Sequence, residues 1–503
     1  MSLSQFGFGI AVFAVPDYLT KLRRMAQNPA ALLWIGLYVL FLLGGLASED
    51  VNYFLKDIRT KMPLWVMPAA LAFMPALSRR QHALVLHFFV AGCTVAMLAG
   101  WYNLFAGVVV DRRDLSPLVS HIRLGLYLVL SLFILLRFSL RGNADLRFFP
   151  RWIYPALFFV LGFWLFYLKS FTGVLFFLLL FPPALLFLTL RNVKRGLRIA
   201  CVVLFAAGAL ATAGYSAYCV RQFYRVNEVD YAKLPVLTAK GNPYAHFSDI
   251  KTTENGNYIW IYLQFDELRA AWDERSPIPV DSADKKGNLL RATLLRYLAS
   301  KNLPRDAEGV GKLTDSDVRH IENGIPNYLY AQPFNIKGRI YETLWELEAY
   351  AGSGDPNGKS MSARIELWKA ALSAGLRNPF SGYGTGDVRT ALDEELLLAD
   401  SQLKYYGQYG PHNQYLAVWL AVGIPGLLWM WVAFLYPLFD RRYRPSFLFY
   451  VVLALLVLSA LNEDIFETQA SVTFFAFVYH LLLSDGLRRQ SAAVDAAGGA
   501  VDI

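Results

Sequence analysis

His412 is the residue of this sequence best placed to do chemistry. It stands in Pro411-His412-Asn413-Gln414, directly before an apolar stretch long enough to cross a membrane. A neutral imidazole can accept a proton from a hydroxyl group, so His412 is a candidate general base. We expect the positive end of the following helix to disfavour the imidazolium form and to keep the ring neutral near physiological pH. A histidine that only caps this helix is the alternative interpretation.

Three acids, Glu463, Asp464 and Glu467, crowd a short turn between two later apolar stretches. Carboxylates at this place could orient His412, bind an acceptor amine or balance the charge of arginines. A solvated turn whose acids take part in ion pairs is the alternative. Glu463 and Glu467 would lie near one face only if the turn were already helical.

A glycine-rich segment, residues 378–387 with the sequence NPFSGYGTGD, precedes His412. Its backbone N–H groups could bind an anion, as such groups do in tight turns. A turn around Gly384 that only shapes the wall of a pocket is equally compatible with the sequence. Asp387, at the end of the segment, could simply cap the next helix.

Apolar blocks dominate the composition. Hydrophobic residues make up 55% of the 503 residues and charged residues 17%, whereas soluble domains have about 25% charged residues. A helix that spans a bilayer needs about 20 apolar residues. We predict ten spans, at residues 30–47, 62–78, 82–104, 121–138, 152–169, 172–190, 197–219, 412–437, 445–461 and 468–486. A short segment at residues 6–15 is an eleventh candidate.

Lysines and arginines collect in alternate loops, which sets the orientation of the predicted spans. The basic loops lie at residues 21–24, 79–80, 137–151, 191–198, 441–444 and 488–489. The positive-inside rule makes these loops cytoplasmic. The net charge of +9 is therefore first a topology signal, and nucleic-acid binding is a poor second explanation.

This topology divides the chain into four regions. They are an N-terminal transmembrane region at 1–219, an external domain at 220–411, a C-terminal transmembrane region of three spans at 412–486, and a cytoplasmic tail at 487–503. The sequence thus predicts an all-α polytopic membrane protein with about 10–12 transmembrane helices. Its large external domain is inserted before the last three spans.

The external domain should be mostly helical. Amphipathic patterns predict helices at residues 259–272, 288–298, 340–351 and 362–376. Thr314 predicts another helix start, and Ser360 or Ser362 should cap the helix at 362–376, because short polar residues cap free backbone N–H groups. No cysteine pair lies in this domain and no His/Cys cluster has metal-ligand spacing, so we predict neither a disulfide nor a metal site.

The His412 segment carries a family resemblance. His412-Asn413, nine residues and then Gly423-x-x-Gly426 resemble the signature of the O-antigen ligase/polymerase superfamily of bacterial inner membranes. Residues 362–371, the glycine-rich segment and residues 462–467 are similar to further motifs of the family. The resemblance covers roughly residues 250–475 and is nearest to the Bacteroidetes-type branch. Members pass a glycan from undecaprenyl diphosphate to lipid A–core, a growing glycan or a protein.

The resemblance also implies roles for single residues. In the family an arginine of the external loop holds the donor diphosphate, and the matching position is Arg364. A guanidinium offers a planar fork to two phosphate oxygens and keeps its charge. Trp368, one turn further on, could pack against that plane or against a prenyl chain. A surface ion pair for Arg364 and a core position for Trp368 are the alternatives. Asn413 belongs to the same predicted substrate-binding set.

The second cation of the family site is less clearly matched. Many relatives carry Ser-Arg near the outer end of an earlier span, but this chain reads Lys169-Ser170-Phe171, with Phe171 where the arginine would stand. Lys169 could supply the charge, or it could be a lysine whose amine only reaches the membrane surface. Arg123 is the other candidate, because a charge at the start of a span is costly unless it is paired or functional.

The resemblance implies an inverting transfer on the periplasmic face that needs neither a metal nor a cofactor. His412 would take the proton of the acceptor hydroxyl, and Arg364 would stabilise the leaving diphosphate. The partners would be an undecaprenyl-diphosphate-linked glycan, lipid A–core or another glycan acceptor, and membrane lipid. Ligation to lipid A–core ranks before glycan polymerisation and protein O-glycosylation. A transporter or flippase, with charges buried near the midplane, and a sensor that does not need His412 are the alternatives outside this class.

Overall fold

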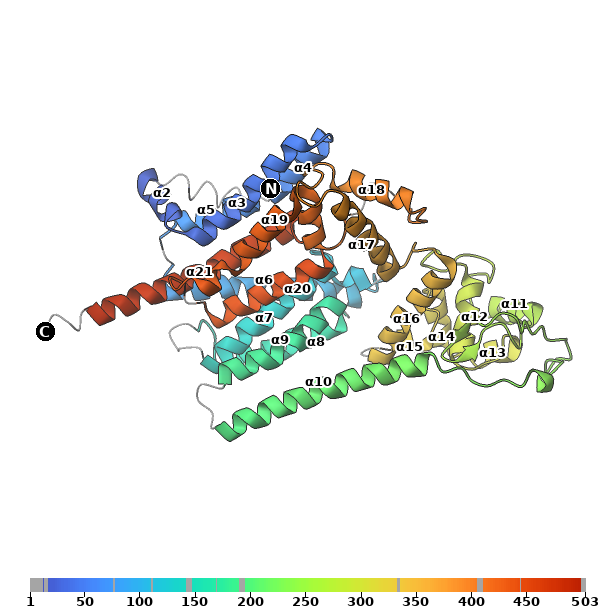
Figure 1. Cartoon of the computed structure of the whole chain (residues 1–503). Helices are drawn as coiled ribbons and strands as arrows, with labels where there is room; N and C mark the ends of the chain where they lie inside the picture. The colour runs from blue at the N-terminus through green and yellow to red at the C-terminus, as the bar shows by residue number, and fades with distance from the viewer. Residues whose placement is uncertain are drawn as a thin grey trace. The chain divides into compact units, whose positions relative to one another are not determined.

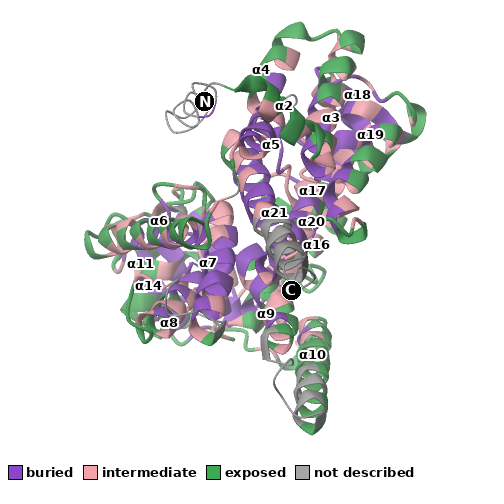
Figure 2. Cartoon of the chain, turned by 90° about the vertical axis from the view of Figure 1, so that its left-hand side faces the viewer, coloured by how far each residue is buried: buried purple, intermediate pink, exposed green. Residues whose placement is uncertain are grey.

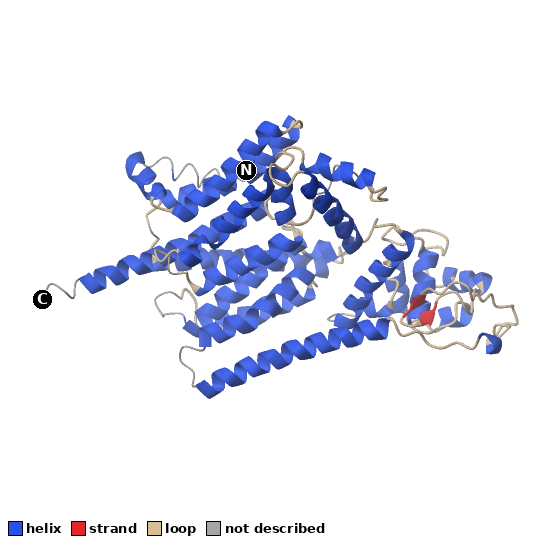
Figure 3. Cartoon of the chain, viewed as in Figure 1, coloured by secondary structure: helices blue, strands red, loops and turns tan. Residues whose placement is uncertain are grey.

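Helices make up most of the computed structural model of this chain. The structure describes residues 12, 17–75, 77–109, 112–141, 147–168, 170–189, 195–332, 335–404, 410–443 and 445–498. Among them are two strands of two residues each, β1 (Thr253–Glu254) and β2 (Asn257–Tyr258), which pair antiparallel (Figure 3). The predicted all-α class is confirmed at this level. The candidate span at residues 6–15 lies outside the described residues apart from residue 12.

The chain divides into two compact units. The first combines Met1–Cys201 with Ser353–Ile503, and the second is Val202–Gly352. Residues 353–411, which we predicted as part of the external domain, therefore pack within the first unit. Arg364, the glycine-rich segment and His412 all belong to this first unit.

The first unit is built from helices of both halves of the chain (Figure 1). The N-terminal ones are α2 (Tyr18–Ala26), α3 (Pro29–Gly44), η1 (Gly45–Ala47), α4 (Val51–Lys61), α5 (Pro63–Phe73), α6 (Arg79–Phe105), η2 (Arg112–Leu115), α7 (His121–Arg141), α8 (Ile153–Tyr167) and α9 (Phe171–Thr189). The C-terminal ones are α17 (Ser360–Arg377), α18 (Val388–Leu398), α19 (Gln414–Phe439), α20 (Phe447–Asn462) and α21 (Gln469–Gly498).

Several of these helices can cross a membrane. In the described part of the chain, four segments are long and apolar enough: Pro29–Ala47, Arg79–Phe105, His121–Leu140 and Gln414–Phe439. Shorter apolar helices are Ile153–Tyr167, Phe171–Phe187, Phe447–Asn462 and Gln469–Ser484. All eight coincide with predicted spans, which supports a multi-pass membrane protein. The predicted span at 62–78 corresponds only to the 11-residue helix α5, which contains Pro68.

The helices of the first unit share one apolar core. Helix α7 packs against α8 and α9, and its side chains are mostly buried (Figure 2). Helix α3 packs against α5 and α19. The ring of Trp34 on α3 lies 4.9 Å from that of Tyr479 on α21 and 5.6 Å from that of Phe434 on α19. The two halves of the chain are thus held together through aromatic contacts.

Helix α19 is broken where the glycine-rich segment contacts it. Pro425 cannot donate a backbone hydrogen bond and its ring crowds the carbonyl one turn earlier, and the backbone leaves helical geometry at Val422 and Gly423. The groups that the break exposes are satisfied by the segment, since Ile424 N–H donates to Pro379 O and Tyr383 N–H donates to Leu420 O. Gly423 is therefore packed closely against the glycine-rich segment, where an added Cβ would meet Phe380 O.

The second unit contains helices of the region that is predicted to be external, most of them short. Helix α10 (Arg195–Phe223) leads into it, followed by η5 (Tyr231–Lys233), α11 (Phe265–Asp273), α12 (Leu290–Ser300), α13 (Ala307–Gly311), α14 (Asp315–Glu322), α15 (Tyr328–Ala331) and α16 (Ile336–Ser353). The helices predicted at 288–298 and 340–351 are confirmed as α12 and α16. Thr314 caps α14, as predicted, through a reciprocal pair of hydrogen bonds with Asp317.

Two local predictions are wrong. The helix predicted at 259–272 begins only at Phe265, because Gln264 caps α11 and residues 259–262 form turns and a bend, with Tyr262 at a φ of 55°. Ile259, Ile261 and Leu263 are buried and their neighbours are not, an alternation that does not fit the period of a helix. The helix predicted at 362–376 is confirmed as α17, but Lys359 occupies its N-cap position and neither Ser360 nor Ser362 caps it.

Replacing Gly423 by alanine should destabilise the first unit. The residue has a φ of 70°, which costs a residue with a Cβ about 1–2 kcal/mol, and the new Cβ would lie 1.9 Å from Phe380 O. We expect a lower melting temperature for the purified protein in detergent. Gly92→Ala in α6 is the control, because its Cβ would meet no atom within 4 Å. Equal melting of the two variants would show that the break does not need glycine.

Candidate functional site

His412 lies just before α19 and not in its first turn. Asn413 is the N-cap residue, and its Oδ1 accepts hydrogen bonds from the N–H groups of Tyr415 and Leu416 at 3.0 and 3.2 Å. Asn413 therefore does the capping that was the alternative role for His412. The backbone of His412 is left-handed, with a φ of 49°, and its side chain is about one third exposed (35%).

Asp464 holds this unusual backbone in place. Its carboxylate accepts hydrogen bonds from His412 N–H at 2.9 Å and from Asn413 N–H at 2.8 Å. Nδ1 of the imidazole lies 3.7 Å from Oδ2 of the same carboxylate. Of the three roles weighed for the acidic turn, Asp464 thus fits the one of orienting His412.

The surroundings favour a neutral imidazole. Burial lowers the pKa of His412 to about 4, and the positive charge of Arg364 contributes to the lowering. The neutral imidazole predicted from the sequence thus has a different physical cause, which is burial and the charge of Arg364 and not the positive end of the helix. Burial also raises the pKa of Asp464 to about 7, helped by the negative charge of Glu467.

Arg364 and Glu463 form the second part of the site. Arg364, on α17, donates from Nη2 to Oε1 of Glu463 at 2.8 Å, and both side chains are largely buried. The carboxylate pairing considered as an alternative for Arg364 is therefore present. A guanidinium has five N–H donors, so this single contact leaves donors for a second anion.

Arg123 belongs to the same cluster. Burial raises the pKa of Glu463, while the positive charges of Arg364 and then of Arg123 oppose that rise. Two cations therefore act on one carboxylate, at the start of α7 and on α17. Lys169, the other candidate for a second cation, lies outside the described residues.

Glu467 takes part in a buried ionic triad. Nζ of Lys61 lies 2.5 Å from Asp57 and 2.7 Å from Glu467, and the Lys61 side chain is 2% exposed. The two carboxylates raise the pKa of Lys61 against the effect of burial. Burial raises the pKa of Asp57. Burial also acts to raise the pKa of Glu467, but the charge of Lys61 and the hydrogen bonds with Asp57 and Lys61 together lower it. The acidic turn is not helical, so Glu463 and Glu467 do not share a helix face.

Sequence reasoning missed Lys61 and Asp57. Their spacing of four residues in α4 is typical of a helical ion pair, and this signal was available. Their burial was not available, because it arises from tertiary packing of α4 against α21 and from the ring of Phe41, 5.0 Å from Lys61 Nζ.

The glycine-rich turn contacts the protein's own acceptors. Thr385 N–H donates to Gly44 O and Gly386 N–H donates to Ser48 Oγ, while a Cβ at Gly384 would lie 2.7 Å from Ser48 Oγ. These contacts support a turn that shapes the wall of the site. Contact between Gly384 and a substrate stays a prediction.

Asp387 links this turn to another part of the first unit. It occupies the N-cap position of α18, but its carboxylate does not cap that helix, so that prediction is wrong. The carboxylate instead accepts hydrogen bonds from Glu49 N–H at 2.7 Å and Asp50 N–H at 2.9 Å, just before α4. Backbone N–H donors just before α4 thus take the place of the N–H groups of α18 that a local cap would bind.

Some buried polar atoms around the site have no hydrogen-bond partner in the described part of the chain. They include Nε1 of Trp368, Nε2 of Gln414 and Oδ1 of Asn462. Trp368 follows Arg364 by one turn of α17, and its ring is partly buried. Unsatisfied buried polar atoms are uncommon and call for an explanation such as a bound ligand or water.

A comparison with protein families gives one match to this region. Residues 324–431 match the family described as O-antigen ligase. The matched segment contains Arg364, the glycine-rich turn and His412. Comparison with curated proteins gives no match.

Replacing Lys61 by methionine should destabilise the protein strongly. The change keeps the length of the side chain but leaves Asp57 and Glu467 buried without a cation, and breaking a buried ion pair costs about 3–5 kcal/mol. Thermal melting of the purified protein measures the effect. Lys56→Met, an exposed lysine of the same helix, is the control and should melt like the wild type. Equal melting of both variants would contradict a structural role for the triad.

Proposed function

Since its residues 324–431 place the chain in the O-antigen ligase superfamily, we propose that it transfers a glycan from undecaprenyl diphosphate to an acceptor hydroxyl. The acceptor that we rank first is lipid A–core, which makes the chain an O-antigen ligase. The site faces the periplasm from the inner membrane, and the C-terminus lies in the cytoplasm. The basic loops of the sequence support this orientation.

One observation carries the proposal. Glu463 and Asp464 are consecutive residues, and they contact Arg364 and His412, respectively. A phosphate-binding cation and a neutral base are thereby anchored to the same turn. A reaction that needs both a hydroxyl to lose its proton and a diphosphate to leave requires these two groups side by side.

The donor diphosphate binds to Arg364. It accepts hydrogen bonds from the N–H groups of the guanidinium that Glu463 does not occupy, and Arg123 adds the second positive charge that Lys169 was also considered for. Fixed cations in a buried site stabilise the charge that develops on the leaving diphosphate without reorganising at the moment of reaction. Trp368 lines the same face of α17 and contacts the donor's lipid or its diphosphate.

His412 acts as the general base. Its neutral imidazole accepts the proton of the acceptor hydroxyl, whose oxygen forms the new bond to the anomeric carbon as the bond to the diphosphate breaks. Attack from the side opposite the leaving group inverts the anomeric configuration. Asp464 positions His412 through the backbone, and Asn413 fixes the start of α19. Both residues therefore support the base without touching the reacting atoms.

Purified protein in lipid nanodiscs tests this function directly. It is incubated with an undecaprenyl-diphosphate glycan and, in separate reactions, with lipid A–core, a second donor molecule or a peptide. We expect mass spectrometry to show glycan on lipid A–core, with His412→Ala inactive and His246→Ala in the second unit active. Transfer to the second donor would identify a polymerase, and full transfer by His412→Ala would refute the assignment of the base.

The pH dependence of transfer should follow Asp464. The pKa of its carboxyl is raised to about 7, so it takes up a proton as the pH falls through that value, whereas His412, with a pKa of about 4, stays neutral. Protonation removes the charge that holds the N–H groups of His412 and Asn413. We therefore expect the transfer rate to fall between about pH 8 and pH 6.

The Asp464→Asn variant distinguishes the ionisation of Asp464 from that of His412. This variant should be slower than the wild type at about pH 8 and should show no drop around pH 7, because its amide does not titrate there. Asp281→Asn, which removes an exposed carboxylate of the second unit, is the control and should keep the wild-type profile. A drop near pH 7 that persists in Asp464→Asn would assign it to another group.

A further inference from the structure

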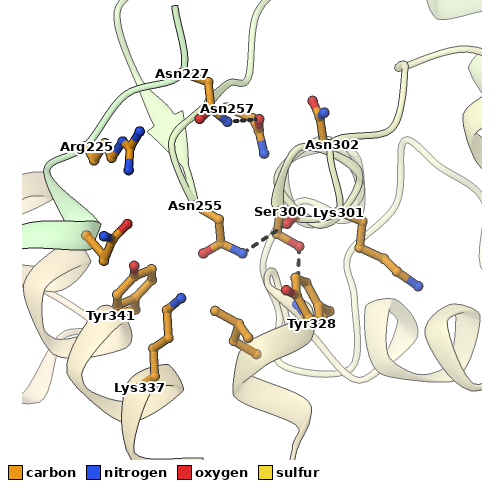
Figure 4. Close-up of a pocket in the computed structure, with 12 residues that line it drawn as sticks. Arg225, Asn227, Asn255, Asn257, Ser300, Lys301, Asn302, Tyr328, Lys337 and Tyr341 are labelled. Atoms are coloured by element: carbon orange, nitrogen blue, oxygen red, sulfur yellow. Dashed lines mark hydrogen bonds between the residues drawn. The ribbon is translucent and has the colours of Figure 1, made fainter. Parts of the chain in front are cut away.

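The second unit contains a polar cavity of about 690 Å³ (Figure 4). Its volume lies in the range of small-molecule sites, about 300–1,000 Å³. The end of α10, the β1–β2 turn, the end of α12 and helices α15 and α16 contribute residues to its wall. All of these residues belong to the second unit, and none of them takes part in the site around His412.

The lining combines amides, hydroxyls and aromatic rings with positive charge. Four asparagines, a glutamine, a serine and two tyrosines contribute to the wall, together with Arg225, Lys301 and Lys337. No aspartate or glutamate is among the lining residues. Lys301 is paired with Asp317 at 2.7 Å, so the net positive charge comes from the other two cations.

Arg225 and Lys337 are available to an anion. Neither forms an ion pair with a carboxylate in the described part of the chain, and Nζ of Lys337 lies 5.2 Å from the ring centre of Tyr341. Figure 4 shows the charged ends of both side chains turned toward the space beside Asn255. A ligand with one acidic group can therefore be contacted from two sides.

The amide wall is held rigidly by its own hydrogen bonds. Asn227 Nδ2 donates to Asn257 Oδ1 at 2.7 Å, and Asn257 Nδ2 donates to Ala299 O at 3.0 Å. Asn255 Nδ2 donates to Ser300 O at 3.0 Å, and Ser300 Oγ accepts from Tyr328 N–H at 3.2 Å. Side chains fixed in this way lose little conformational entropy when a ligand binds.

A buried charge pair supports this wall from behind. Glu254 is 2% exposed and accepts hydrogen bonds from Arg296 Nε at 2.8 Å and Asn327 Nδ2 at 2.6 Å. Asn327 in turn donates to Asn255 Oδ1 at 2.9 Å. The position of the amides in the cavity is thus tied to the core of the second unit.

We propose that this cavity binds an acidic sugar unit of a glycan. Sugar hydroxyls both donate and accept hydrogen bonds, as asparagine amides do, and the partly buried ring of Tyr328 offers an apolar surface to the C–H face of a pyranose. The carboxylate of the sugar contacts Arg225 and Lys337. The inference rests on the proposed function in one respect: the bound glycan is the one that the protein transfers or extends.

The amides distinguish this ligand from a phospholipid headgroup. A phosphate alone would be satisfied by the two cations, and the amides would then lose their contacts with water without gaining a partner. A hydroxylated ring uses both sets of groups. The chemistry of the wall therefore favours an acidic saccharide over a lipid phosphate.

Binding to defined probes tests the proposal. Calorimetry compares an acidic tetrasaccharide of alternating glucuronic acid and N-acetylglucosamine with neutral chitotetraose and with a short-chain phosphatidylglycerol. The acidic probe should bind at least ten times more tightly than the neutral one. The double variant Arg225→Gln/Lys337→Gln should weaken that binding at least tenfold, because both charges are lost.

Matched variants make the result specific. Lys233→Gln/Lys312→Gln removes two exposed positive charges of the same unit and should leave binding unchanged. His412→Ala should also bind normally, because His412 does not line the cavity. Wild-type protein that binds the probe but transfers no glycan would overturn the proposed function and keep this site. No binding of the acidic probe, equal binding of chitotetraose, or loss of acidic binding in the Lys233/Lys312 control to the same extent would overturn the site. Binding of phosphatidylglycerol alone would overturn it too.

Discussion

The carboxylate of Asp464 accepts hydrogen bonds from two consecutive backbone N–H groups, and the position of His412 depends on this contact. A left-handed backbone costs a non-glycine residue such as His412 about 1–2 kcal/mol. A hydrogen bond to a charged group contributes about 1.5–3 kcal/mol, so two of them offset that cost. The imidazole is therefore placed by hydrogen bonds to a buried carboxylate from a distant turn of the chain, and α19 then begins after its N-cap residue Asn413.

Other contacts of the first unit hold the turn that carries Asp464 in its position beside His412. Glu463 brings Arg364 of α17 to the same turn, and Glu467 fixes the turn's other end to Lys61 of α4. The glycine-rich turn contacts both α4 and the break in α19. Each acid of the turn thus has a different partner, and a loss of any one cation would leave a carboxylate buried without compensation.

Much of this arrangement follows from the sequence, and the part that does not has identifiable causes. The spans, His412 and the acidic turn are indicated by local patterns of hydrophobicity, charge and spacing, whereas Arg364 is indicated by the resemblance to the ligase family. The buried triad around Lys61 is not, because a lysine in an amphipathic helix is exposed unless a distant helix covers it. Asp387 has the usual sequence signal of a helix cap, yet its carboxylate accepts hydrogen bonds from backbone N–H groups before α4 and not from those of α18. Residues 259–263 resemble a helix in sequence because their apolar residues continue the pattern of α11, but turns and a bend precede that helix.

The ionisation of His412 is the measurement that tests this account most directly. Protein labelled with ¹⁵N only at histidine is titrated in detergent, and the His412 signals are assigned from their loss in His412→Gln. The account predicts a neutral imidazole down to about pH 5 with a midpoint near 4, set by burial and by Arg364. A midpoint at or above the ordinary value for histidine, about 6.5, would contradict it, because burial and Arg364 would then not be lowering the pKa of the ring.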